Sequence, residues 1–116
     1  MLGRAHRFHG YNSLNGVYRR GKTARAPMMS LRFAGRGADK PYRVAVVVSR
    51  KVNKSAVTRN RIRRRIYAAV RETARQEETA VRPGTDLVFT VFNDQVAELP
   101  QTELKETIAK LLGKAG

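Results

Sequence analysis

The sequence predicts an α+β fold in which helices pack on one small, mostly antiparallel sheet. Segments with a helical period of apolar residues and segments with strand patterns follow one another in the order helix, strand, strand, helix, strand, helix. The 116 residues suffice for one domain with a modest core, and neither a repeat nor a second domain is evident. We therefore expect a flexible basic arm over residues 1–10 and a single domain over residues 11–116.

The first predicted element is a short helix over residues 12–20. Leu14, Val17 and Tyr18 share one face of such a helix, and Gly21 can end it. Tyr18 can either pack in the core or present its ring to an unpaired base, and the residues alone leave both readings open.

Two predicted strands follow this helix. Residues 28–34 alternate between apolar and polar side chains, which is typical of a half-buried strand. Residues 42–49 are apolar on both faces and predict a central strand. The connection over residues 35–41 contains two Gly, an Asp and a Pro, so we expect an antiparallel hairpin. A short additional strand near Lys22–Ala24 is compatible with the pattern.

A long helix is predicted over residues 57–76, with Thr58 in position to cap its start. Its core-facing side chains recur at helical spacing and form one stripe: Ile62, Ile66, Ala69, Val70 and Thr73.

The C-terminal part predicts a third strand over residues 86–92 and a closing helix. We expect Phe89 and Phe92, like Phe33, to lie in the core. Pro100 stands near the start of the closing helix and Gly113 just past its end. One face of this helix is apolar: Leu104, Ile108, Leu111 and Leu112.

Positive charge dominates the composition and is unevenly distributed. The chain has 24 Lys and Arg against 9 Asp and Glu. Residues 1–71 hold 19 of the basic residues and one acidic residue, Asp39, whereas residues 72–116 carry a net charge of −3. Such a field repels itself unless a polyanion neutralises it, and Arg, which outnumbers Lys 17 to 7, matches phosphate geometry. Nucleic acid is therefore the first expected partner, and an anionic membrane surface the second.

The densest positive charge lies on the long helix, opposite its apolar stripe. Asn60, Arg61, Arg64 and Arg71 share that outer face, while Arg63 and Arg65 flank the stripe and can extend outward. A merely solvated face would mix in acids, because like charges one turn apart destabilise a helix, but no acid occurs between Asp39 and Glu72. The pattern favours a phosphate-binding face.

The segment before this helix adds three positive charges, Arg50, Lys51 and Lys54, among small polar residues. Backbone N–H groups at the helix start can contribute further phosphate contacts. As an ordinary loop it would also be basic, so this signal alone is weak.

Groups for protein-borne catalysis are scarce. The chain has no Cys, which excludes a disulfide scaffold, a thiolate zinc site and a cysteine nucleophile. Two-metal nuclease chemistry needs clustered carboxylates, and the basic half offers only Asp39. His6 and His9 lie in the predicted arm without a third ligand nearby. We expect no catalytic residue and no metal site on the protein.

The run Lys51-Val52 followed by Ala56-Val57-Thr58-Arg59-Asn60-Arg61-Ile62-Arg63-Arg64 resembles the Arg-Asn-Arg signature of the protein component of bacterial ribonuclease P. The resemblance covers most of the chain: residues 15–21 resemble the family's first helix, 27–33 and 43–49 its first main strands, 84–89 its late strand, and 99–112 its closing helix. The chain departs from the family's pattern at Asn53, where Gly is usual, and at Asn93 and Asp94, where a basic residue is often found.

The resemblance implies a left-handed βαβ crossover and a ribonucleoprotein function. The protein would bind the catalytic RNA and the 5′ leader of precursor tRNA, and would assist cleavage that the RNA performs with Mg²⁺. It implies no cofactor on the protein, no membrane and no obligate protein partner. The charge pattern and the resemblance together predict these residues for RNA binding: Arg50, Lys51, Lys54, Arg59, Asn60, Arg61, Arg63, Arg64 and Arg71. Those for a leader-binding cleft are Leu14, Tyr18 and Met29.

Three other functions compete with this reading. A ribosomal-type structural RNA-binding protein has the same composition, and only the ordered signature argues against it. A self-sufficient nuclease lacks its carboxylate or His cluster, and a membrane-surface binder needs bulkier apolar anchors than the Ile/Ala/Val stripe. No apolar run is long enough to span a bilayer and residues 1–10 do not resemble a secretory signal, so we expect a soluble, cytoplasmic protein.

Overall fold

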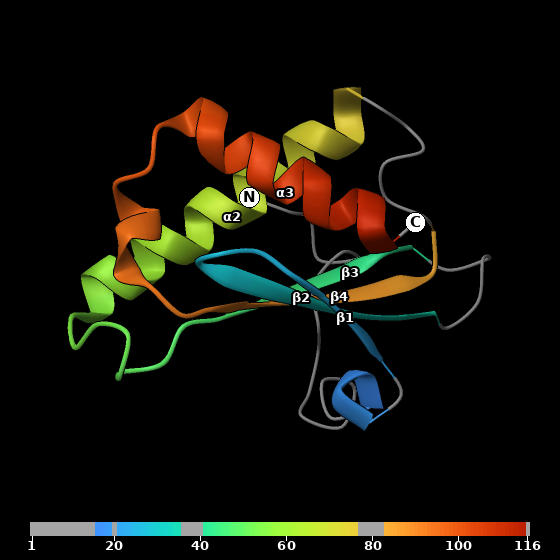
Figure 1. Cartoon of the computed structure of the whole chain (residues 1–116), viewed down its shortest axis with the longest axis horizontal. Helices are drawn as coiled ribbons and strands as arrows, with labels where there is room; N and C mark the ends of the chain where they lie inside the picture. Colours follow the sequence, from blue (N-terminus) through green and yellow to red (C-terminus); the bar gives the residue numbers. More distant parts are fainter. Residues whose placement is uncertain (1–15, 20, 36–40, 77–82, 116) are drawn as a thin grey trace.

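The α+β fold is confirmed, with helices on a four-stranded mixed sheet (Figure 1). The computed structural model describes residues 16–19, 21–35, 41–76 and 83–115, so the predicted arm over residues 1–10 lies outside the described part. Residues 16–19 are helical and are called the first helix below. The other elements are β1 (Lys22–Arg25), β2 (Met29–Gly35), β3 (Arg43–Val47), α2 (Ala56–Gln76), β4 (Thr85–Val91), the 3₁₀ helix η2 (Asp94–Ala97) and α3 (Gln101–Ala115).

The strands lie in the order β1-β2-β4-β3, which corrects two predictions. β2 and β3 form no hairpin, because β4 lies between them, antiparallel to β2 and parallel to β3. β3 is therefore an edge strand, and the central position belongs to β4, whose residues 86–89 are all buried. The additional strand near Lys22–Ala24 is present as β1, paired antiparallel to β2.

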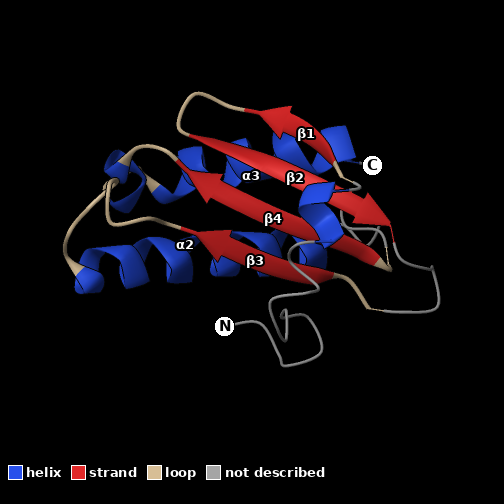
Figure 2. Cartoon of the chain, turned by 90° about the horizontal axis from the view of Figure 1, so that it is seen from below, coloured by secondary structure: helices blue, strands red, loops and turns tan. Residues whose placement is uncertain are grey.

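The connection from β3 through α2 to β4 is a left-handed crossover, the rarer hand for parallel neighbours (Figure 2). In that view both strands point to the left, α2 lies behind the sheet, and the chain rises from β3 to β4. Following the chain up β3, back along α2 and up β4 traces a left-handed turn, as the family resemblance implies.

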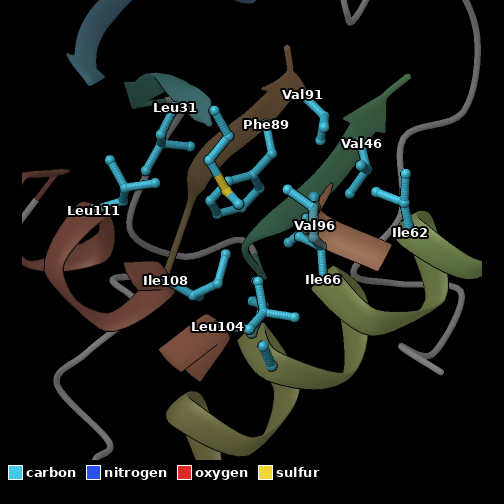
Figure 3. Packing of buried hydrophobic residues seen from close by; sticks show 14 of the residues in the cluster. Leu31, Val46, Ile62, Ile66, Phe89, Val91, Val96, Leu104, Ile108 and Leu111 are labelled. Carbon is cyan, nitrogen blue, oxygen red and sulfur yellow. The ribbon is translucent and has the colours of Figure 1, made fainter. Parts of the chain in front are cut away.

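α2 and α3 cover one face of the sheet and form the main core with it (Figure 3). The buried residues of α2 are the predicted stripe, and those of α3 are the predicted leucines and isoleucine. The helix boundaries differ slightly from prediction. Ser55, rather than Thr58, caps α2, since its Oγ accepts the Thr58 N–H at 3.3 Å. Gly113 lies within α3, which continues to Ala115.

The opposite face of the sheet, called the open face below, is covered only in part. Strand residues that alternate with the core-facing ones point to it, among them Ala34 on β2, Ala45 on β3 and Val88 on β4. Val17 of the first helix packs on these residues in a small second cluster. Figure 1 shows the first helix (blue) on the side of the sheet opposite α2 and α3.

The three Phe side chains predicted for the core divide between environments. Phe89 is fully buried and Phe33 is half-buried against the main core. Phe92 is 54% exposed, so its core assignment is wrong. The Phe92 N–H donates to Met28 O at 2.8 Å, which extends the β2–β4 ladder by one pair. Strand alternation past the buried Val91 then places the Phe92 side chain on the open face.

Candidate nucleic-acid interface

The first half of α2 presents two kinds of arginine. Arg61 and Arg64 are exposed, and neither guanidinium makes a hydrogen bond or ion pair within the described residues. The apolar stripe of α2 faces the core, so both side chains project from the outer side of the helix. These two arginines have free donors for phosphate oxygens, which Arg can bind in bidentate fashion.

Arg59 and Arg63 are half-buried, and their guanidinium groups donate hydrogen bonds within the protein. Arg59 Nη1 donates to the carbonyls of Asn53 and Lys54, both at 3.0 Å. Arg63 Nη1 donates to Asn60 Oδ1 at 2.8 Å, and its Nη2 lies 3.4 Å from Val48 O. Arg59 thus ties α2 to the preceding loop, and Arg63 ties it to the end of β3.

Arg65 turns toward the interior side of α2 instead of outward. Its guanidinium donates to Val96 O at 2.6 Å and to Leu99 O. These carbonyls belong to η2 and to the turn before α3. The expectation that Arg65 extends to solvent is therefore corrected: it fastens η2 to the long helix and has little left for phosphate.

The loop over residues 48–55 carries the remaining predicted cations near the start of α2. Arg50, Lys51 and Lys54 are exposed, and none of their side chains makes a hydrogen bond within the described residues. Backbone bonds shape the loop, since the N–H groups of Val52 and Asn53 lie 3.1 and 3.5 Å from Ser49 O. The loop and the first half of α2 together form one basic surface, called the Arg face below: Arg50, Lys51, Lys54, Arg59, Arg61, Arg63 and Arg64.

Arg71 lies two turns beyond Arg64, about 10 Å along the helix axis, near the start of β3. It is exposed and stands close enough to Tyr42 for its charge to act on the phenol. Burial raises the pKa of Tyr42, and the Arg71 charge opposes that rise only in part. Arg71 is thus separated from the Arg face.

The two predicted leader-binding residues within the described ranges, Tyr18 and Met29, are not brought together. Tyr18 is 39% exposed at the end of the first helix, and Leu14 lies outside the described residues. Met29 is fully buried in the main core, on the helix-covered side of the sheet, so its assignment to a surface cleft is wrong. In the alternation of β2, Met29 points toward α3 and its neighbour Ser30 points to the open face.

Arg32 and Gly21 position the first helix on the open face. Arg32 Nη2 donates to Tyr18 O at 2.6 Å, and its Nη1 donates to Thr23 Oγ1 at 2.9 Å. The Gly21 N–H donates to Val17 O at 2.8 Å. A Cβ on Gly21 would lie 2.5 Å from Val17 O and 2.9 Å from Phe33 O, so only glycine fits this close approach.

A buried ion pair lies on the open face where β3 and β4 begin. Arg43 on β3 donates from Nε and Nη2 to the two carboxylate oxygens of Asp86 on β4, at 2.8 and 2.7 Å. Asp86 is fully buried, whereas the Arg43 side chain keeps 18% of its surface exposed. The hydrogen bonds that Arg43 donates to the Asp86 carboxylate raise the pKa of Arg43, so its guanidinium stays charged at any ordinary pH.

The family follows from comparison with known proteins. The family model described as Ribonuclease P matches residues 2–116. The chain belongs to the ribonuclease P protein family. It is 39% identical to the ribonuclease P protein component of Gluconacetobacter diazotrophicus over 116 residues, which cover 100% of this chain and 96% of the relative. It is 36% identical to that of Chloroflexus aurantiacus over 112 residues, which cover 97% of this chain and 78% of the relative.

Solved structures of ribonuclease P proteins share the fold. The Staphylococcus aureus RNase P protein superposes with a TM-score of 0.72 at 16% identity, covering 97% of this chain and 96% of the other. The Thermotoga maritima RNase P protein gives a TM-score of 0.68 at 24% identity, covering 87% and 89%. The resemblance inferred from the Arg-Asn-Arg run is confirmed for the family and for the fold.

Two features of this ribonuclease P protein escaped the sequence reasoning. Phe92 is an exposed aromatic residue on the open face, and it could have been found by extending the alternation of β4 past Val91. Arg32 orients the first helix, and no local pattern announces that role because its partners lie up to fifteen residues away. Within the described ranges, no helix is long and apolar enough to cross a membrane, and no group of three His, Cys, Asp or Glu could hold a metal ion. His6 and His9 lie outside those ranges.

Proposed function

We propose that this protein is the subunit of a ribonuclease P ribonucleoprotein that binds its RNA partner through the Arg face. The observation that carries the proposal is the exposure of Arg61 and Arg64 beside three exposed loop cations, in a family whose members are named as ribonuclease P protein components. Residues 40–71 contain no acid, so no carboxylate within that stretch neutralises this surface. A phosphate backbone supplies the missing countercharge.

We further propose that the open face receives the 5′ leader of precursor tRNA. Tyr18 and Phe92 are exposed aromatic residues there, and an aromatic ring stacks on an unpaired base of any sequence. On the same face, Ser30 and Thr90 lie opposite each other on β2 and β4 and offer hydroxyl groups. Arg25, paired with Ser30 from β1, adds a cation at the edge. A single strand suits this surface because its bases are free to stack.

Catalysis is assigned to the RNA partner with Mg²⁺, and no protein side chain is assigned a chemical step. The support is the sequence itself, since one acidic residue in the first 71 cannot build a two-metal site. The protein would neutralise repulsion between two RNA chains and raise the affinity for substrate. No membrane and no obligate protein partner is invoked, and a cytoplasmic location stays a prediction.

The decisive experiment is a 5′-processing assay on a precursor tRNA at low Mg²⁺. Protein alone, a bacterial ribonuclease P RNA alone, and both together would be compared. We expect cleavage at the mature 5′ end only when both are present. Cleavage by the protein alone would contradict the assignment of catalysis to RNA. Tight RNA binding without stimulation would instead support a ribosomal-type structural role.

The Arg face is tested separately by salt dependence. Replacing Arg61 and Arg64 with Ala should weaken RNA binding and lower the salt slope by about 0.7–0.9 per lost phosphate contact. Adding Arg59→Ala should weaken binding further and also loosen the loop that Arg59 holds. Lys110→Ala, an exposed cation on α3, is the matched control and should leave the slope unchanged. An unchanged slope in the Arg variants would remove the Arg face from the interface.

A further inference from the structure

Arg59 and Arg63 hold the basic loop to α2, and one further side-chain hydrogen bond among the described residues holds it to η2. Asn53 Nδ2 donates to Asp94 Oδ2 at 3.0 Å, across 41 positions of sequence. Asp94 opens η2, directly after β4.

Every polar group of Asn53 makes a hydrogen bond. Its Oδ1 accepts the Ser55 N–H at 2.8 Å, and its backbone carbonyl accepts from Arg59 at 3.0 Å. Its own N–H lies 3.5 Å from Ser49 O. Asn53 therefore joins the middle of the loop, the start of α2 and η2. Within the described residues, Asp94 is the one partner of the Asn53 side chain that lies outside the loop and α2.

Asp94 is fixed at its own end. Val96 and Ala97 of η2 are buried in the main core, and Asn93 Oδ1 caps η2 by accepting the Gln95 N–H at 2.9 Å. Arg65 holds η2 to α2 through Val96 O. Because η2 is anchored in this way, the Asp94 carboxylate is a rigid support for the loop.

Asp94 is a negative charge beside a surface that is proposed to bind phosphate. A carboxylate beside a phosphate-binding surface repels phosphate, so Coulomb interactions alone would disfavour an acid at this position. A hydrogen bond that orders the loop before binding works in the opposite direction, since the loop then loses less freedom when RNA binds. Repulsion of phosphate by Asp94 lowers the affinity for RNA, and ordering of the loop raises it. The hydrogen bond from Asn53 to Asp94 is explained by the second effect and not by the first.

We propose that Asn53 and Asp94 are positioning residues that hold the basic loop in its binding conformation without touching RNA. The proposal rests on the proposed RNA-binding function. It extends that function by assigning affinity to an acidic residue, which the charge pattern of the sequence would count as unfavourable.

The test compares Asp94→Ala with Asp94→Asn. Both remove the negative charge, but the Asn side-chain oxygen can still accept from Asn53 Nδ2. The probe is a bacterial ribonuclease P RNA, and affinity is measured over a series of salt concentrations. We expect Asp94→Ala to bind about three- to ten-fold more weakly than wild type, the range expected for one lost hydrogen bond. Asp94→Asn should bind as tightly as wild type or more tightly.

Two controls separate positioning from charge and from general damage. Glu98→Gln removes an exposed negative charge at the other end of η2 and should not weaken binding. The salt slope of Asp94→Ala should match wild type, because the same phosphates are contacted once the loop is ordered. Asn53→Ala combined with Asp94→Ala should be no weaker than Asn53→Ala alone, as expected when Asp94 acts only through its bond to Asn53.

If Asp94→Ala binds as tightly as Asp94→Asn, Asp94 acts by charge alone and the proposal is overturned. Amide exchange of the free protein gives a readout that needs no RNA. The Ser55 amide should exchange faster in Asp94→Ala and at the wild-type rate in Asp94→Asn. Equal exchange in the two variants would also overturn the proposal. Failure of wild type to bind the RNA would instead count against the proposed function and leave this exchange test standing.

Discussion

The two faces of the sheet use the same strands for opposite purposes. The helix-covered face carries nearly all of the apolar burial, including Phe89, Leu31 and Val46 beneath α2 and α3. Within the described residues, the open face has one small buried cluster, in which Val17 of the first helix covers Ala34 and Val88. Alternation along each strand separates the two faces, so adjacent residues in the sequence serve different roles. Stability is concentrated on one face, and the other is free to carry exposed aromatic and polar groups.

The largest difference between the faces should appear when neighbouring β4 residues are truncated. Phe89→Ala should destabilise the protein by about 3–5 kcal/mol, because it leaves a cavity in the main core. Thr90→Ala, one residue further and on the open face, should change stability by no more than about 0.5 kcal/mol. Urea unfolding followed by circular dichroism measures both. Similar losses for the two variants would mean that the open face is packed as tightly as the core.

The Arg43–Asp86 pair is the exception on the open face. Asp86→Ala should cost about 3–5 kcal/mol, since removal of one partner leaves the other charge partly buried without compensation. Arg43 retains some contact with water, so we expect the lower end of that range. The paired variant Arg43→Met with Asp86→Leu should recover most of the loss. A loss below about 1 kcal/mol for Asp86→Ala, the value of an exposed pair, would show that water reaches the site.

Gly21 tests whether the first helix can be displaced without disturbing the core. Gly21→Ala should cost about 1–3 kcal/mol, because the added Cβ meets two backbone carbonyls that cannot move away easily. Binding to the RNA partner should persist, since the Arg face lies on other elements. Affinity for precursor tRNA should fall, because Tyr18 moves with the helix. Equal effects on both affinities would show that the two surfaces are not independent.

Local periodicity predicted the positions of the elements and the core-facing residues. It did not predict which strands pair with each other. The stripes of α2 and α3 follow from spacing within one helix, so the sequence was sufficient for them. The position of β4 between β2 and β3 depends on a crossover over α2, and no residue between β2 and β3 encodes it. β3 looked central because Ala45 and Val47 are apolar, yet the first helix and β4 only half-bury them at an edge.

The Arg face shows the same limit at the level of single side chains. The charge pattern identified the surface, but it could not distinguish Arg61 and Arg64, which have free donors, from Arg59, Arg63 and Arg65, which hold backbone carbonyls. That distinction depends on where the loop and η2 lie relative to α2. Met29 was wrongly assigned to the cleft, although the alternation of residues 28–34 places it on the same face as Leu31 and Phe33. Phe92 was wrongly assigned to the core, although alternation past Val91 places it on the other face.

The smallest effect on stability should come from Phe92, and it should coincide with a clear effect on binding. Phe92→Ala should change stability little, because the side chain is already more than half exposed. If the ring stacks on a leader base, its loss should cost about 1–3 kcal/mol of binding energy. The measurement is the affinity of the reconstituted ribonucleoprotein for a precursor tRNA with its leader and for the same tRNA without one. Phe92→Tyr preserves the ring and should behave as wild type. A weakening that is equal for both substrates would place Phe92 outside the leader path and leave Tyr18 as the exposed aromatic of the open face.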